Sequence, residues 1–312
     1  MIQKLIDTSA NISDGGRAKL YWEGLYPKKF KSVPTSQKEV DLQNILQTFK
    51  LKGFEFGNWL SNEDRYRYVL ATQKSLLDMA LIFGTKNIGM DYSLGIAFGA
   101  RGLQKASAHY ESHTNMINLT KRRGSFGSLA HEYGHAIDFV FGRHIDQNKN
   151  FGALSGGHSV AKKLEENTGC QFRFLVNEIV DTIKDSESYK RLKYEGEYWH
   201  RRTEIFARAF EQYISYCLIS RTIVNKFIAS DIDSYYRGRA YLKKEDFKKV
   251  LPYFNELVKQ ISMFLRNKGK LVPTVPKNEV PATKTIAALK ATKKKTTIPK
   301  VTNRKKAAAA NK

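Results

Sequence analysis

Two histidines and a glutamate stand together in the segment 128–138, and their spacing indicates metal chemistry. On a helix, His131 and His135 project from one face because they lie four residues apart, so both imidazoles can reach a single Zn²⁺. Glu132, beside the first histidine, can reach a water on that ion and is the candidate general base. The segment therefore predicts a zinc hydrolase. The alternative is an exposed helix whose two histidines bind no ion.

A catalytic zinc usually has three protein ligands, so a third ligand must lie downstream. The pattern HExxHxxGxxH is absent because position 138 is Asp and position 141 is Phe, which argues against the three-histidine class. The strongest candidate is Glu204, in the segment 202–211, whose apolar spacing predicts a second buried helix. His200 is its main rival. The alternative role for Glu204 is an ion pair with Arg208, extended to Glu211.

These ligands imply a mechanism of peptide hydrolysis. Zinc held by two neutral imidazoles and a carboxylate lowers the pKa of water towards about 7, and Glu132 takes the proton as that water attacks a carbonyl. The resulting oxyanion needs a donor in addition to zinc. The candidate donors are Tyr198, His200, His158 and Arg208. Asp138 could accept a ligand N–H and orient that imidazole, or serve as a plain helix charge.

Apolar spacing predicts the elements that position these side chains. Residues 62–83 repeat near 3.6 and predict a helix that ends at Gly84. The aromatic segment 54–59 and three short apolar runs before the metal helix predict strands and a hairpin. The three runs are 94–101, 106–110 and 116–119. For the metal helix itself, Ser125 or Ser128 is the expected N-cap and Gly142 the expected stop.

A strand next to the metal helix suggests where a substrate would bind. The edge of such a strand can pair with an extended peptide and hold its carbonyl over the zinc, although an ordinary sheet strand fits the same residues. His109 and His113 lie there outside metal spacing, and we expect them to be structural. The glycine-containing segment 143–160 predicts a flexible loop that borders the cleft.

Composition bounds the class of protein. A chain of 312 residues with 41% hydrophobic residues can form one substantial catalytic domain plus smaller additions. Residues 1–21 lack the apolar core of a signal peptide, and no segment approaches about 18 consecutive apolar residues. The two cysteines, Cys170 and Cys217, are expected to be reduced core thiols. We therefore predict a soluble cytoplasmic protein without an export signal or membrane contact.

The charge is strongly basic, with a formal net charge of +23. Residues 267–312 carry 13 Lys and Arg against Glu279 alone, so this tail holds +12 and the remaining 266 residues hold +11. With so little apolar content we predict a disordered arm that attracts nucleic-acid phosphates. Its basic clusters are Lys293, Lys294 and Lys295, and Arg304, Lys305 and Lys306. The alternative is a solubilising extension or a packaging signal without a specific ligand.

The predicted organisation is an accessory lead-in (1–48), a catalytic domain (49–266) and this tail (267–312).

Several blocks together resemble the zincin-like metallopeptidase domain among the large polyvalent protein-associated domains of phages and conjugative elements. The blocks are 53–59, 94–102, 108–111, 117–121, 127–135 with Asp138, and 204–211. The resemblance covers roughly residues 49–264. It implies an α+β, gluzincin-type fold with a small sheet before the metal helix and a mostly helical C-terminal half. It also implies His131, His135 and Glu204 as ligands of one zinc ion and Glu132 as base.

Three functional hypotheses follow. The chain is an active peptidase acting on a protein or peptide, or it is a catalytically silent DNA-associated or virion structural protein that keeps a metal site for stability. The third hypothesis, which we prefer, combines the two: a peptidase encoded by a phage or mobile element and tethered to nucleic acid by its tail. Such a protein would act in the bacterial cytoplasm or be packaged in a virion.

Overall fold

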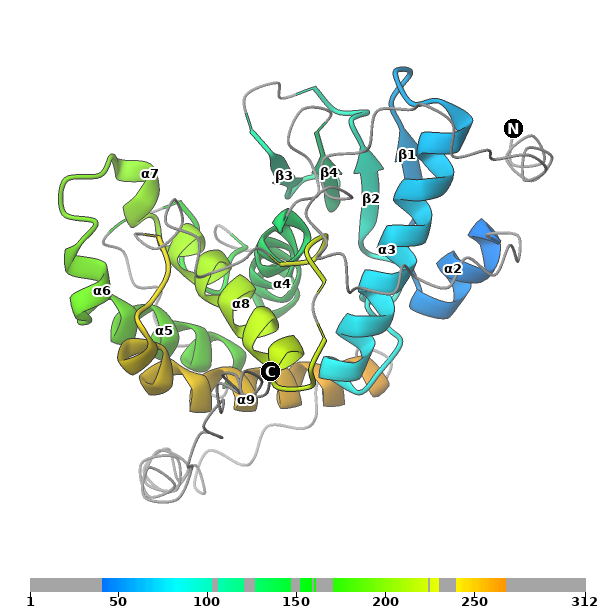
Figure 1. The fold of residues 1–312 in the computed structure, drawn as a ribbon. Helices are drawn as coiled ribbons and strands as arrows, with labels where there is room; N and C mark the ends of the chain where they lie inside the picture. The colour runs from blue at the N-terminus through cyan, green and yellow to red at the C-terminus, as the bar shows by residue number, and fades with distance from the viewer. Residues whose placement is uncertain are drawn as a thin grey trace, which may run out of the picture. The chain divides into compact units, whose positions relative to one another are not determined.

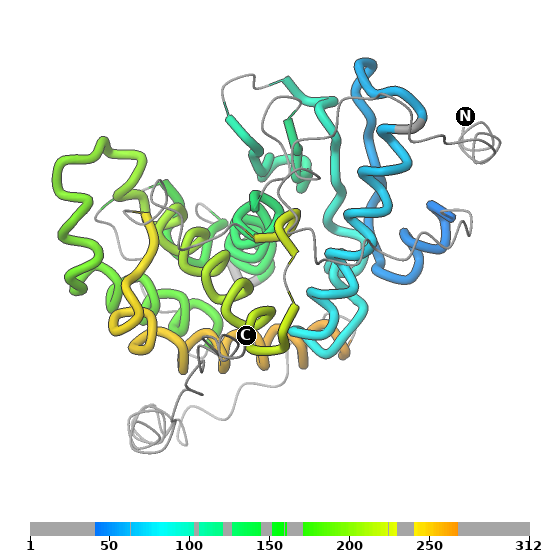
Figure 2. The backbone as a smooth tube through the Cα atoms, in the orientation of Figure 1, coloured from blue at the N-terminus to red at the C-terminus, as the bar shows by residue number. Residues whose placement is uncertain are grey.

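The structure is a computed structural model. It describes residues 41–102, 106–120, 127–146, 152–158, 160, 171–223, 225–229 and 240–267, and these are coloured in Figure 2. All of them belong to one compact unit that spans residues 1–274. The predictions for residues 1–40, for Cys170 and for the tail clusters at 293–295 and 304–306 lie outside the described residues.

Four short strands form one mixed sheet within the described part of the chain (Figure 1). The strands are β1 (Phe54–Phe56), β2 (Gly95–Phe98), β3 (Ala108–Glu111) and β4 (Met116–Leu119). Their order is β1-β2-β4-β3, with β1, β2 and β4 parallel and β3 antiparallel to β4. The predicted hairpin before the metal helix is therefore confirmed, and β3 stands at one edge of the sheet.

The described chain after the sheet is mostly helical, so the α+β class and its order of elements are confirmed. The helices are α2 (Leu42–Phe49), α3 (Asn62–Phe83), α4 (Ser128–Asp146), α5 (Gln171–Lys184), α6 (Glu187–Lys190), α7 (Glu197–His200), α8 (Arg202–Ile219) and α9 (Lys244–Arg266). Within the residues that the structure describes, none of these helices is both long and apolar enough to cross a membrane.

Helix α3 has the bounds that the apolar spacing predicted. It begins after Ser61, whose side chain accepts a hydrogen bond from the backbone N–H of Asp64, and it ends at Gly84 in the left-handed conformation with φ of 61°. Tyr68 of α3 packs on Phe98 of β2, with ring centroids 5.1 Å apart. Helix α3 therefore covers one face of the sheet.

Helix α4 lies between the sheet and α8 (Figure 1). On the sheet side, Phe139 meets Tyr110 of β3 with ring centroids 6.0 Å apart. By strand register, Tyr110 is on the same face as Phe98, so α3 and α4 cover the same side of the sheet. On the other side, Tyr133 stacks on Phe210 of α8 at 6.2 Å. Helix α9 runs across α3, α5 and α8 and closes this helical layer (Figure 2).

The predicted stop of the metal helix at Gly142 is wrong, because α4 continues to Asp146. A Cβ atom at position 142 would lie 2.4 Å from the carbonyl oxygen of Gly152. Glycine is therefore needed at position 142 because the segment after α4 packs directly against this position. It does not end the helix. The sequence pattern could not distinguish these two uses of glycine.

Residues 152–158, the longest described stretch of the predicted flexible loop 143–160, are largely buried instead. Ala153, Leu154 and Ser155 are fully buried. The Ser155 backbone N–H and hydroxyl both donate to the carboxylate of Asp138, and the Ser155 carbonyl accepts from Arg202. This segment is therefore held between α4 and α8 and supports the site described next.

Candidate metal centre

The two predicted helices bring the three predicted ligands together. His131 and His135 lie one turn apart on α4, and Glu204 lies in the first turn of α8. Their nearest donor atoms are all within 4.8 Å of one another, so the three residues form a group that could hold a metal ion. His200, the rival third ligand, is not part of this group.

The distances within the group fit metal coordination better than simple hydrogen bonding. The Nε2 atom of His131 is 3.4 Å from Glu204 Oε2, and the Nε2 atom of His135 is 3.3 Å from Glu204 Oε1. Charge-assisted N–H···O bonds are usually shorter, about 2.7–2.9 Å. Ligand atoms placed tetrahedrally at about 2.0–2.2 Å from a zinc ion stand about 3.4 Å apart. The spacing therefore suits an ion between these atoms.

An unsatisfied carboxylate oxygen supports the same conclusion. Glu204 is 6% exposed, and its Oε2 atom has no hydrogen-bond partner. A buried carboxylate without a partner is costly, so such an atom calls for a ligand. A cation between Glu204 and the two imidazoles would satisfy it.

The pKa values of His135 and Glu204 are shifted because these buried groups lie close to one another. Burial disfavours the charged form of His135, but the neighbouring carboxylate of Glu204 outweighs burial and raises the His135 pKa to about 9. Burial also disfavours the charged form of Glu204, but both histidines outweigh it and hold the pKa of Glu204 far below its ordinary value. Without a metal, His135 is therefore protonated at neutral pH.

Glu132 is the candidate base and lies buried next to His131, with 6% of its surface exposed. Burial raises its pKa above the ordinary value, while His131 and His135 oppose that rise. His109 on β3 also acts on Glu132 electrostatically, and its Nε2 atom is 3.4 Å from Glu111 Oε1. A desolvated carboxylate beside the ligand cluster is a suitable proton acceptor.

The ring nitrogen of His135 that faces away from Glu204 contacts a hydroxyl group at the start of α8. The Nδ1 atom of His135 lies 2.9 Å from Thr203 Oγ1, and Thr203 in turn bonds to Asp138. Asp138 is fully buried, and burial raises its pKa. Asp138 therefore reaches His135 through Thr203, and its role in orienting the imidazole stays a prediction.

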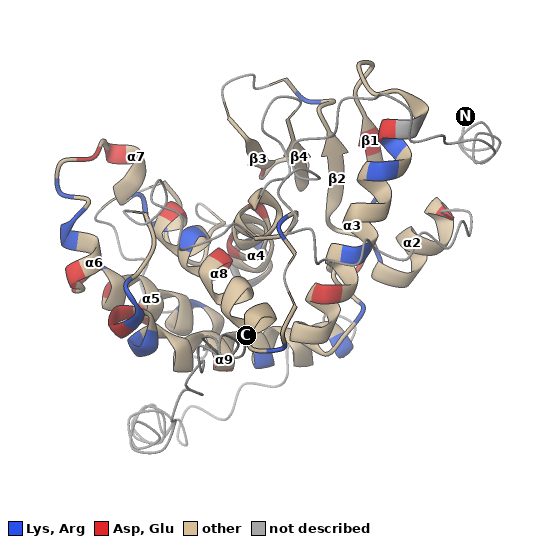
Figure 3. Cartoon of the chain, viewed as in Figure 1, with Lys and Arg blue, Asp and Glu red and all other residues tan. Residues whose placement is uncertain are grey.

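The second ring nitrogen of His131, Nδ1, lies near an acidic side chain. Its Nδ1 atom is 3.8 Å from Glu211 Oε2, and that oxygen accepts a hydrogen bond of 2.5 Å from the hydroxyl of Tyr241. Glu211 shares a face of α8 with Glu204 and Arg208, and Figure 3 shows acidic and basic segments along α8 beside α4. The sequence showed this shared face but not that Glu211 would approach His131.

The four candidate donors occupy different surroundings. Tyr198 is half exposed, and burial of its hydroxyl together with the neighbouring Glu204 carboxylate raises its pKa. Arg208 is buried, donates to the carbonyl of Trp199 and lies 3.6 Å from Glu204 Oε2. His200 is engaged with the hydroxyl of Tyr189 at 2.9 Å. The ring of His158 faces Phe139 at 6.2 Å.

Comparison with known proteins identifies one segment of the chain. Residues 190–264 match the family described as Large polyvalent protein-associated domain 1. The matched segment contains Glu204, Arg208 and Glu211 on α8, whereas the histidine helix lies outside it. No curated protein and no solved structure matches the chain. The polyvalent part of the predicted resemblance is therefore confirmed for residues 190–264.

We expect Zn²⁺ to bind more tightly as the pH rises from 7 to 9. Below its pKa of about 9, His135 carries a proton that the ion must displace. The dissociation constant should fall by about tenfold per pH unit and level off above that pKa. Titration calorimetry in buffers with different ionisation enthalpies measures both the affinity and the released proton. An affinity that does not change between pH 7 and 9 would contradict this account.

Replacing Thr203 with Val should weaken Zn²⁺ binding by about 10–100-fold while the fold is kept, because the side chain keeps its shape but no longer orients His135. The matched control is Thr72→Val, since the Thr72 hydroxyl is buried in α3 without a hydrogen-bond partner. The dissociation constants of the two variants are compared by competition with a zinc chelator. Equal affinities for both variants would exclude the orienting role of Thr203.

Proposed function

We propose that the chain is a zinc-dependent peptidase with a zincin-like, gluzincin-type fold. The single observation that carries the proposal is the buried Glu132 beside a His131, His135 and Glu204 group of the right ligand types and spacing. The arrangement of the elements supports it, because a small mixed sheet with an antiparallel edge strand precedes the histidine helix and α8 supplies the carboxylate.

The donor set supports zinc as the metal. Two imidazole nitrogens and one carboxylate are the protein ligands typical of a catalytic zinc site. When bound there, zinc would supply a Lewis acid that polarises a carbonyl and makes water more acidic. The residues that would hold it are His131, His135 and Glu204, with Thr203 and Glu211 beside the outer ring nitrogens.

Glu132 would move the protons in this reaction. Its carboxylate takes a proton from the attacking water and then gives it to the amine of the leaving peptide. Burial raises the pKa of Glu132, which makes the carboxylate a better base. Tyr198 is the favoured donor to the oxyanion, because its hydroxyl already lies beside Glu204.

The edge strand β3 is the proposed binding position for the substrate backbone. Among the described residues β3 pairs with β4 alone, and it contacts the histidine helix α4. A peptide in extended conformation can add to such an edge through main-chain hydrogen bonds. This position would present the scissile carbonyl to Glu132 and the ligand group.

Replacing Glu132 with Gln should abolish peptide cleavage and leave zinc bound. Loss of a general base lowers the rate by about 10²–10⁴-fold, whereas the three ligand side chains are unchanged. Metal analysis and a search for new peptide ends in a proteome-derived peptide mixture provide the two measurements. The control is Glu187→Gln, an exposed glutamate on α6 that pairs with Lys190. If both variants and the wild type bind zinc and none produces new ends, the catalytically silent structural protein is the correct assignment.

We also propose that the basic tail tethers this peptidase to nucleic acid, in a protein encoded by a phage or mobile element. The proposal is supported by the +12 charge of residues 267–312 and by the polyvalent family match. A chain that ends at residue 266 should bind duplex DNA more weakly than the full chain, with a smaller dependence on salt. Fluorescence anisotropy over a salt titration measures this difference. Equal binding by the two chains would refute the tether.

A further inference from the structure

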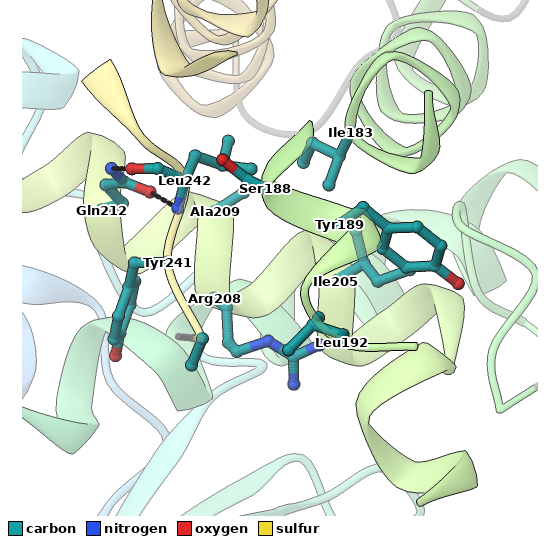
Figure 4. Close-up of a pocket in the computed structure, with 11 residues that line it drawn as sticks. Ile183, Ser188, Tyr189, Leu192, Ile205, Arg208, Ala209, Gln212, Tyr241 and Leu242 are labelled. Carbon is teal, nitrogen blue, oxygen red and sulfur yellow. Dashed lines mark hydrogen bonds between the residues drawn. The ribbon is translucent and has the colours of Figure 1, made fainter. Parts of the chain in front are cut away.

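A cavity lies on the side of α8 next to the face that carries Glu204 (Figure 4). The free space between its lining residues, counted together with open solvent at its mouth, is about 310 Å³. Its walls come from the end of α5, from α6 and the residues after it, from α8, and from the segment before α9. The lining residues are Ile183, Ser188, Tyr189, Leu192, Ile205, Arg208, Ala209, Gln212, Ala240, Tyr241 and Leu242. We call it the Arg208 cavity.

Most polar side chains of the Arg208 cavity already bond to the protein. The pairs are Ser188 with Asp246, Tyr189 with His200, Gln212 with Leu242, and Tyr241 with Glu211. Figure 4 shows the two bonds between Gln212 and Leu242 as dashed lines. The rest of the wall is aliphatic, apart from Arg208. A ligand of this cavity would therefore find an apolar wall and one charged group.

Arg208 is that charged group, and its guanidinium is incompletely satisfied. Its side chain is 7% exposed, and its Nη2 atom donates to the carbonyl of Trp199. Its Nη1 atom is buried and has no hydrogen-bond partner. The nearest acidic atom to Nη1 is Glu204 Oε2 at 3.6 Å, which is beyond hydrogen-bond distance. In Figure 4 the guanidinium extends along the cavity wall towards Leu192.

The partial ion pair with Glu204 does not compensate Arg208 once the metal site is filled. Glu204 is a ligand in the proposed site, so its charge is shared with the ion. A buried guanidinium without a full partner is costly, and a carboxylate satisfies it best because its two oxygens match the planar N–H groups. Glu204 and Arg208 are one helical turn apart, so a carboxylate at Arg208 would belong to a substrate residue close to the scissile bond.

We infer that the Arg208 cavity binds a carboxylate carried by the peptide substrate, and that the enzyme therefore prefers an acidic residue beside the cleaved bond. The inference rests on the proposed peptidase function and names its substrate class. An apolar wall leading to one cation suits the methylene stem and charged end of a glutamate side chain. The free carboxylate at a peptide C-terminus offers the same chemistry, and the experiment separates these two sources.

The test compares three peptides of otherwise identical sequence with the zinc-loaded full chain. The first has Glu and the second Gln beside the cleavable bond, both with an amidated C-terminus, and the third has Gln with a free C-terminal carboxylate placed at that residue. We expect the Glu peptide to have a KM about 10–100-fold lower than the Gln peptide, as for loss of one charge-assisted bond. If only the third peptide has a lower KM, the cavity binds the C-terminal carboxylate of a peptide. That result would overturn the preference for an acidic side chain. Equal KM values for all three peptides would overturn the inference. Cleavage of these peptides would still support the proposed peptidase function.

Variants separate recognition from structural effects. Arg208→Met should remove the discrimination between Glu and Gln peptides, and Arg208→Lys should keep part of it. Because Arg208 also lies near Glu204, a second variant leaves it in place: Ala209→Leu fills the cavity from α8 and should raise the KM of the Glu peptide selectively. The matched control is Arg201→Met, since Arg201 pairs with Glu197 and does not line the cavity. Undiminished discrimination in Arg208→Met and Ala209→Leu would overturn the inference.

A binding measurement tests the inference without any cleavage. Trp199 stacks on the Arg208 guanidinium, with the guanidinium carbon 5.1 Å from its ring centroid, so its indole N–H signal reports on the cavity. We expect N-acetyl-glutamate to shift that signal at a concentration at least about tenfold below N-acetyl-glutamine, and Arg208→Met to abolish the difference. If wild type cleaves no peptide but this difference is found, the proposed peptidase fails and the carboxylate site stands. If the two compounds act alike, the carboxylate site fails.

Discussion

Helices α4 and α8 approach each other closely at Gly134, where an added Cβ atom would lie 3.1 Å from the Cα atom of Ala207. Gly134 stands between the two histidines, and Ala207 follows Glu204 by three residues, so the absence of large side chains at this contact sets the separation of the ligands. Next to this contact, the stacking of Tyr133 of α4 on Phe210 of α8 also holds the two helices together. A bulkier residue at Gly134 would separate the imidazoles from the carboxylate before any ligand was itself changed.

This contact concentrates charge in a region with little water. Glu132, Glu204 and Glu211 are all buried near the two histidines, and the buried cation Arg208 lies 3.6 Å from Glu204. Burying so many ionisable groups is unfavourable unless they are paired. A divalent cation placed among His131, His135 and Glu204 would neutralise the excess acid. The cost of burying these charges is therefore consistent with the proposed metal site.

The sequence predicted the parts of this site that local periodicity determines. His131 and His135 follow from i, i+4 spacing, Glu204 follows from the apolar pattern of its helix, and the bounds of α3 follow from a cap, a 3.6 repeat and a glycine. The errors and omissions concern tertiary neighbours. Gly142 was predicted as a helix stop because its contact with Gly152 is invisible in sequence, and the role of Thr203 was missed because its partner His135 is 68 residues away. The Arg208 cavity needed residues from α5, α6, α8 and the segment before α9, so no spacing rule could indicate it.

The segment 152–158 connects α4 and α5 in the sequence and stabilises the site through hydrogen bonds to α4 and α8. Ser155 binds Asp138 of α4 with two groups and receives the guanidinium of Arg202 of α8 on its carbonyl. Arg202 is fixed in turn by Asn177 and Asp181 of α5. Since Asp138 also bonds to Thr203, one hydrogen-bonded network joins α4, α5, α8 and this segment to the imidazole of His135. Glu204 follows Arg202 by two residues and Thr203 by one, so the network that orients the histidine also fixes the start of the helix that carries the carboxylate. The positions of two ligands on different helices are thereby coupled, and a rigid arrangement of ligands is what selective binding of a small cation requires.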